Sequence, residues 1–167
     1  MSRWIIGLVM AATIIIGLLT GGNFDRAFVA IPAWHEVGSV GWADFSRHAD
    51  LGNGLLVYPV MAIGGTAISV IAAVLFMLRG RAPRAAAAPI FLAAAFAVVS
   101  LPFSLKATPY MLSLRHITDS DLGALGRAFS GYEFWGHLQG IFHLASFMAL
   151  VWSLTALGRA EQPQQTR

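Results

Sequence analysis

The sequence alternates between long uncharged, apolar stretches and more polar ones. Four stretches of 21, 28, 21 and 25 residues contain no Asp, Glu, Lys or Arg, at 4–24, 51–78, 85–105 and 134–158. A helix rises about 1.5 Å per residue, so about 20 apolar residues cross the ~30 Å hydrocarbon core of a bilayer. The expected fold class is all-α, an integral membrane four-helix bundle. Its transmembrane helices are predicted at 4–29, 53–78, 85–105 and 133–157.

The polar stretch 25–50 is the first of two predicted outer loops. We expect Pro32 to end the first helix, because an interior proline lacks the N–H donor of a continuing helix. Further along, Trp42, Phe45 and Ala49 recur at helical spacing, opposite charged positions. Aromatic rings among charges are typical of the headgroup layer, so this loop is predicted to carry a short interfacial helix.

The second predicted outer loop covers 106–133. Its segment Thr-Asp-Ser-Asp at 118–121 is typical of a helix N-cap and precedes an apolar face, which predicts another short interfacial helix leading into the fourth span. We expect the two loops to pack together as a cap over the bundle, because their apolar side chains would otherwise form exposed patches. The cap residues are predicted to be Trp34, Trp42, Phe45, Leu122 and Phe129.

The arginines predict the orientation of the bundle. Three of them lie in the short connection 79–84, whereas Lys and Arg are diluted over the two long loops. Short cytoplasmic loops carry an excess of Lys and Arg, so both termini are expected on the cytoplasmic side. The expected location of the protein is the plasma or inner membrane. The predicted domains are a single transmembrane domain over 1–158 and a polar tail over 159–167.

Composition narrows the function classes. The chain of 167 residues is 57% hydrophobic and 11% charged, against about 25% charged in an ordinary soluble domain. Its net charge of +3 comes from scattered basic residues, so nucleic acid is not an expected partner. The absence of cysteine excludes disulfides, thiolate nucleophiles and iron–sulfur clusters. The expected partners are membrane lipid, a hydrophobic small molecule, and an oligomer or membrane complex.

Candidate chemistry gathers in the fourth span. Glu133 and His137 are four residues apart on one helical face, so the carboxylate could orient the imidazole as a general base, although an ordinary surface pair has the same spacing. Gln139 and His143 repeat this spacing close to mid-bilayer, where a histidine is a functional candidate by default. A structural hydrogen bond from His143 to Ser100, Thr66 or a backbone carbonyl near Pro59 explains it equally well.

The predicted site lies beneath the cap at the outer end of the bundle. Gly136 and Gly140 would let another helix approach, and prolines loosen the outer ends of the second and third spans. The predicted catalytic residues are His137, His143 and Glu133. The residues expected to contact a ligand are Gln139, Trp135, Trp34 and Trp42.

No metal site and no cofactor are predicted, although a metal held by outer histidines stays open as an alternative. All five histidines, His35, His48, His116, His137 and His143, belong to the outer half of the predicted topology. Imidazoles beside carboxylates are the ligands that zinc, copper or non-haem iron accept, but no tight His-x3-His motif occurs.

Four segments of the chain read, in order, FVAIPAW, LGNGLLVYP, SLKATPYMLSL and FWGHLQ. Together they resemble the DUF1772 family of small membrane proteins, which includes anthrone oxygenase-like proteins. The resemblance implies oxygenation of a polycyclic phenolic carbon acid without a recognised metal or flavin. Such a carbon acid, once deprotonated, reduces dioxygen itself, so the protein need supply only an apolar pocket and a base. The alternative, from another class, is a non-catalytic membrane accessory or assembly subunit whose glycine faces serve packing.

Overall fold

The computed structural model describes residues 3–79 and 84–161, and the described residues contain α-helices and π-helical turns but no strands. The five α-helices are α1 (Arg3–Asp25), α2 (Ile31–His48), α3 (Gly54–Leu78), α4 (Arg84–Ser113) and α5 (Leu122–Glu161). The π-helical turns η1 (Arg26–Ala30) and η2 (Ala49–Asn53) join α1 to α2 and α2 to α3. The predicted all-α class is confirmed.

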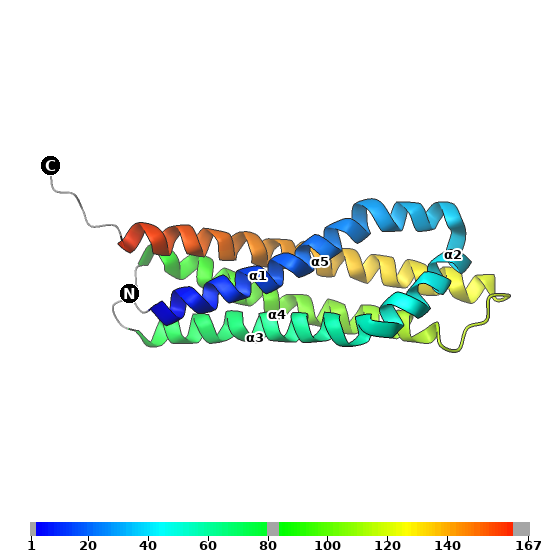
Figure 1. Ribbon diagram of the computed structural model, residues 1–167, viewed down its shortest axis with the longest axis horizontal. Helices are drawn as coiled ribbons and strands as arrows, with labels where there is room; N and C mark the ends of the chain where they lie inside the picture. Colours follow the sequence, from blue (N-terminus) through cyan, green and yellow to red (C-terminus); the bar gives the residue numbers. More distant parts are fainter. Residues whose placement is uncertain (1–2, 80–83, 162–167) are drawn as a thin grey trace.

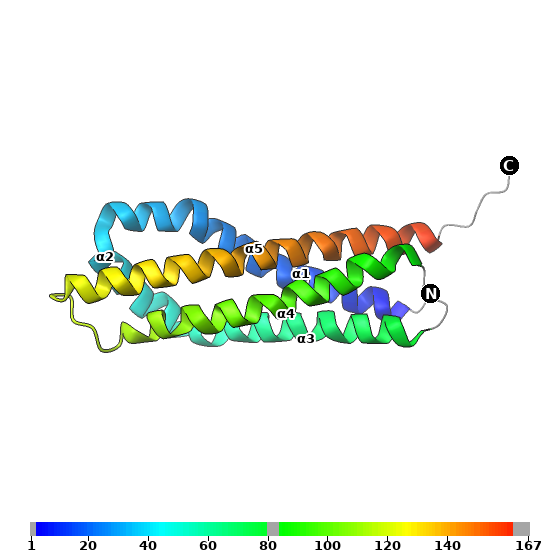
Figure 2. The same cartoon turned by 180° about the vertical axis from the view of Figure 1, so that it is seen from behind.

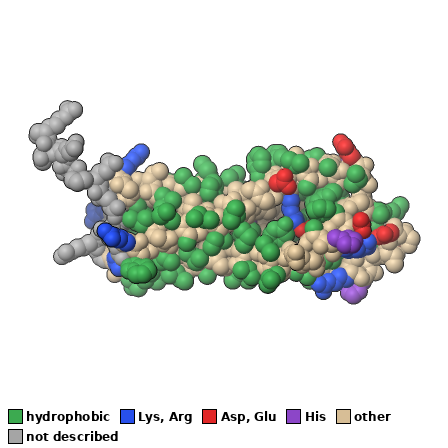
Figure 3. All heavy atoms as spheres, in the orientation of Figure 1, with side chains coloured by type: hydrophobic (Ala, Val, Ile, Leu, Met, Phe, Trp, Pro, Cys, Tyr) green, Lys and Arg blue, Asp and Glu red, His purple; other side chains and the backbone are tan. Residues whose placement is uncertain are grey.

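The long helices α1, α3, α4 and α5 run along the long axis of the molecule (Figure 1). At one end lie α2, η2 and the turn between α4 and α5, and at the other end α1 and α4 begin while α3 and α5 end (Figures 1 and 2). We call the end with α2 the outer end. Charged side chains gather toward the two ends of the face in Figure 3, and hydrophobic side chains fill the band between them.

Three helical segments of the described chain are long and apolar enough to cross a membrane. They are Arg3–Leu78, which contains α1 to α3, then Arg84–Ser113 and Leu122–Arg159. The apolar lengths predicted from the sequence therefore occur in helices, as a membrane protein requires.

The first predicted helix boundary is wrong. The α-helical form of α1 ends at Asp25, and Pro32 lies in the first turn of α2 instead of ending a helix. Proline is tolerated there because the first N–H groups of a helix have no intrahelical partner. The predicted interfacial helix of 25–50 corresponds to α2, which is kinked at Gly38, where φ is 82°.

The third and fourth helices are longer than predicted. α4 continues to Ser113, although Pro102 and Pro109 lie inside it. The second interfacial helix is not separate but forms the first turns of α5, where the backbone N–H of Ala124 donates to Asp121 Oδ1 at 2.9 Å. This cap confirms the N-cap predicted at 118–121. Residues 159–161, the start of the predicted tail, belong to α5. The rest of the tail, 162–167, and residues 80–83 of the connection between α3 and α4 lie outside the described residues.

The inner half of the bundle is a packed core of apolar side chains from all four long helices, including Val9, Ile16, Phe76, Ile90 and Leu150. Glycine permits close approach at two places: a Cβ at Gly17 would meet Phe147 at 2.9 Å, and one at Gly65 would meet Ile16 at 2.8 Å. Hydroxyl groups tie two helices to α4, since Ser146 donates to Ala93 O at 2.9 Å and Thr66 to Ala97 O at 3.4 Å.

A second apolar cluster, the outer cap, joins α2 to the ends of α4 and α5. Trp42 is fully buried, and its ring lies 5.0 Å from that of Phe129, which also contacts Trp34 at 6.4 Å between ring centroids. Trp34 contacts Phe45 as well. Four of the five predicted cap residues thus contact one another, whereas Leu122 is 62% exposed. One turn further on, Leu125 takes the buried position.

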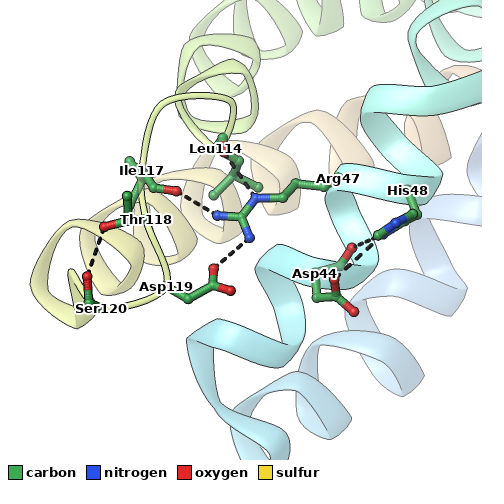
Figure 4. A network of polar contacts seen from close by, with 8 residues as sticks. All are labelled: Asp44, Arg47, His48, Leu114, Ile117, Thr118, Asp119 and Ser120. Atoms are coloured by element: carbon green, nitrogen blue, oxygen red, sulfur yellow. Dashed lines mark hydrogen bonds and ion pairs between the residues drawn. The ribbon is translucent and has the colours of Figure 1, made fainter.

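Arg47 fastens the cap to the α4–α5 turn (Figure 4). Its guanidinium donates to the carbonyl oxygens of Leu114 at 3.1 Å and Ile117 at 2.7 Å, and to Asp119 Oδ1 at 2.6 Å. A single arginine thereby satisfies carbonyls just beyond the end of α4, which have no helical partner.

Candidate functional site

A cavity of about 870 Å³ lies at the outer half of the bundle, where side chains of α1, η1, η2, α3, α4 and α5 line it. Its walls are mostly aliphatic and aromatic, as in pockets that bind small hydrophobic molecules. Each of the four long helices contributes a lining side chain that is also exposed. These are Leu18 of α1, Ile63 of α3, Leu105 of α4 and Ile141 of α5. The cavity therefore opens sideways between helices.

The cavity lies between the packed inner core and the π-helical turns η1 and η2. The core residues of α1 reach no further than Leu19, and those of α3 begin at Met61. Small residues line this space, among them Gly22, Ala62 and Gly136. A Cβ at Gly136 would meet nothing within 4 Å.

The most polar part of the wall is a corner formed by Arg26, Asp50 and Tyr58. Arg26 Nη2 donates to Asp50 Oδ1 and, at 3.2 Å, to the hydroxyl oxygen of Tyr58. The guanidinium also lies 4.9 Å from the ring centroid of Tyr58 and 5.7 Å from that of Tyr132. Asp50 is only 5% exposed, and its Oδ2 atom is buried without a hydrogen-bond partner among the described residues.

Two of the predicted site residues line the cavity directly, His137 and Gln139 of α5. His143 lies one turn deeper and is fully buried, with its Nδ1 at 2.8 Å from Asn23 Nδ2 of α1. The partner is therefore Asn23, not Ser100, Thr66 or a carbonyl near Pro59. Asn23 lines the cavity, whereas His143 does not line it and is hydrogen-bonded to this lining residue.

Glu133 pairs with α2 instead of with its neighbour on α5. Both of its carboxylate oxygens lie 3.2 Å from His35 Nε2, a contact that joins α2 to α5. The structure shows no hydrogen bond between Glu133 and His137 within the described residues. The predicted orientation of His137 by this carboxylate is thus replaced by a bond between α2 and α5.

The three tryptophans predicted to contact a ligand do not line the large cavity. Trp34 and Trp42 belong to the cap above it. Trp135 stacks on Phe103 at 6.2 Å and borders a separate, shallow depression beside Tyr110. The role of these tryptophans in a ligand site stays a prediction. Tyr132 contacts Trp42 of the cap and also lines the cavity.

The outer histidines are dispersed. His35, His48 and His116 are exposed, and His48 Nδ1 bonds to the carbonyl oxygen of Asp44 at 2.8 Å (Figure 4). In the part of the chain that the structure describes, no three His, Asp or Glu side chains lie close enough together to hold one metal ion.

Sequence reasoning missed Arg26 and Asp50. Arg26 was counted only among the basic residues of the two long loops, and Asp50 only as the end of an apolar stretch and as one of the carboxylates beside imidazoles. The sequence carries no signal for this pair, because Asp25 directly precedes Arg26 and acidic and basic residues are mixed throughout 25–50. Only the fold shows that residues 24 positions apart meet in one wall.

Comparisons with protein-family models, with curated proteins and with solved structures found no match to this chain.

Proposed function

We propose that the chain is an integral membrane protein in which α1, α3, α4 and α5 cross the bilayer as a four-helix bundle. The apolar length of these helices supports this, as does the separation of charged side chains toward the two ends (Figure 3). The arginines Arg3, Arg79, Arg84 and Arg159 all belong to the end opposite α2, which the positive-inside rule assigns to the cytoplasm.

Cysteine labelling tests this orientation. The chain has no cysteine, so Arg84→Cys and Ser120→Cys each introduce a unique thiol. We expect a membrane-impermeant maleimide added to intact cells to label the variant at Ser120 and not the variant at Arg84, until the membrane is permeabilised. Labelling of the Arg84 variant from outside would reverse the proposed orientation.

We further propose that the cavity binds a hydrophobic small molecule of the polycyclic phenol type. The observation that carries this proposal is the cavity itself, about 870 Å³ in volume, with mostly apolar walls and one polar corner. Its sideways openings would let such a molecule enter from the bilayer, where an apolar ligand is concentrated. Pockets of this size and lining bury most of the surface of a drug-sized ligand.

Filling the cavity tests the binding proposal. Gly136→Leu adds a side chain that points into open space and should improve the helix propensity of α5 by up to about 1 kcal/mol. We expect binding of the fluorescent probe 1-hydroxypyrene to fall at least tenfold while the melting temperature is kept or raised. Gly7→Leu is the matched control, because Gly7 is also helical and open but does not line the cavity. Equal binding by both variants would contradict the proposal.

The enzymatic form of the proposal is oxygenation of the bound phenolic carbon acid. His137 in the cavity wall supports it, since this imidazole could take a proton from a ligand carbon. For an anthrone, the methylene carbon loses two hydrogens and becomes a carbonyl, while dioxygen leaves one oxygen atom in the product and the other in water. The resemblance to anthrone oxygenase-like proteins favours this chemistry over a purely structural role.

A further inference from the structure

Asp50 stands out among the charged groups of the molecule because its hydrogen bonding is incomplete. Its Oδ1 accepts from Arg26, whereas Oδ2 has no partner among the described residues although the side chain is only 4% exposed. A buried carboxylate oxygen without a donor is costly, and such atoms are rare in native proteins. Asp50 lines the cavity while Oδ2 itself is closed to solvent, so a small rotation of the carboxylate would bring this atom to a bound molecule that supplies the missing donor.

The backbone around this carboxylate is irregular. Arg26 lies at the start of η1 and Asp50 within η2, so both partners sit in π-helical turns, which are rare and often occur at functional sites. Gly52, next but one to Asp50, has a non-helical ψ of −120°. The neighbouring Tyr58 hydroxyl accepts from Arg26, which leaves its own proton free to be donated.

We propose that the Arg26–Asp50–Tyr58 corner is the polar anchor of the cavity and that it selects neutral apolar molecules carrying a hydroxyl group. The ligand hydroxyl would donate to Asp50 Oδ2 and accept from the Tyr58 hydroxyl. A charged ligand head is disfavoured because the corner already pairs one positive with one negative side chain. This inference rests on the proposed function, since it specifies the ligand class of the same cavity.

A matched pair of probes tests the anchor. 1-Hydroxypyrene carries a donor, and 1-methoxypyrene presents the same aromatic body with an oxygen that only accepts. At neutral pH, where the phenol is protonated, we expect the wild type to bind the hydroxyl probe about tenfold more tightly or better, as a hydrogen bond to a charged acceptor implies. Fluorescence titration of the detergent-solubilised full chain gives both affinities.

Asp50→Asn should remove this preference. The amide keeps an oxygen for Arg26 and puts a donor in place of Oδ2, so the two probes should bind within about threefold of each other. The double variant Arg26→Gln with Asp50→Asn, which leaves no lone buried charge, should show the same loss. Asp44→Asn on the exposed face of α2 is the matched control and should keep the wild-type preference.

The outcomes separate the anchor from the cavity. If the wild type binds both probes equally, or if the double variant keeps the preference, the anchor is overturned while the binding cavity stands. If the wild type binds neither probe, the proposed function fails and the anchor fails with it.

Discussion

Replacing Arg26 with methionine is expected to destabilise the protein by about 3–5 kcal/mol, the usual cost of leaving one member of a buried ion pair without its counter-charge. Arg26 is the residue that binds Asp50 Oδ1, and Oδ2 has no other described partner to compensate. The variant would therefore hold an unpaired carboxylate in an apolar wall. Unfolding of the detergent-solubilised protein by denaturant or heat measures the loss.

A double variant distinguishes this cause from lost packing. Arg26→Met combined with Asp50→Leu removes both charges, and replacing a buried pair by apolar side chains is often neutral or stabilising. We expect it to recover most of the lost stability. Arg115→Met, at an exposed arginine beyond α4, should change stability by no more than about 0.5 kcal/mol. Equal stabilities of the single and double variants would refute the buried-pair explanation.

The helices could be predicted because bilayer thickness makes the apolar lengths informative. Each of the four uncharged stretches lies in a long helix except for residues 51–53, which belong to η2, and Asp121 caps α5 as its position before an apolar face indicated. The errors lie where backbone geometry depends on tertiary contacts. Pro32 can start a helix as well as end one, and only the packing of α2 on α5 decides between them.

The cavity lies at the end of the molecule where the sequence predicts a site, but only His137 and Gln139 of the predicted residues line it, and their role in a site stays a prediction. Helical periodicity does not place these two on one face, because they are two residues apart. It could not show that Glu133 bonds across to His35, because helical spacing reveals only neighbours on the same helix. The pairing of Arg26 with Asp50 depends likewise on the path of α2, which local pattern does not encode.

His137→Ala is expected to lower the turnover of anthrone by about 10² to 10⁴-fold if this imidazole is the base of the proposed oxygenation. The side chain is exposed and lines the cavity, and no hydrogen bond to another described residue holds it, so its loss should leave the melting temperature nearly unchanged. Oxygen consumption and the appearance of anthraquinone measure turnover, with the uncatalysed oxidation subtracted by using the Gly136→Leu variant.

His143→Ala is the informative comparison, because the two histidines lie on the same helix in different surroundings. His143 is fully buried and its ring lies 2.8 Å from the amide of Asn23, so its replacement should cost about 0.6 to 2 kcal/mol of stability for the interhelical hydrogen bond alone. Asn23→Ala should cost a similar amount, and the double variant little more, since both remove one shared bond. If His137→Ala instead behaves like His143→Ala, losing stability with no specific loss of turnover, the base is not His137, and the bundle is better explained as a binding or assembly protein.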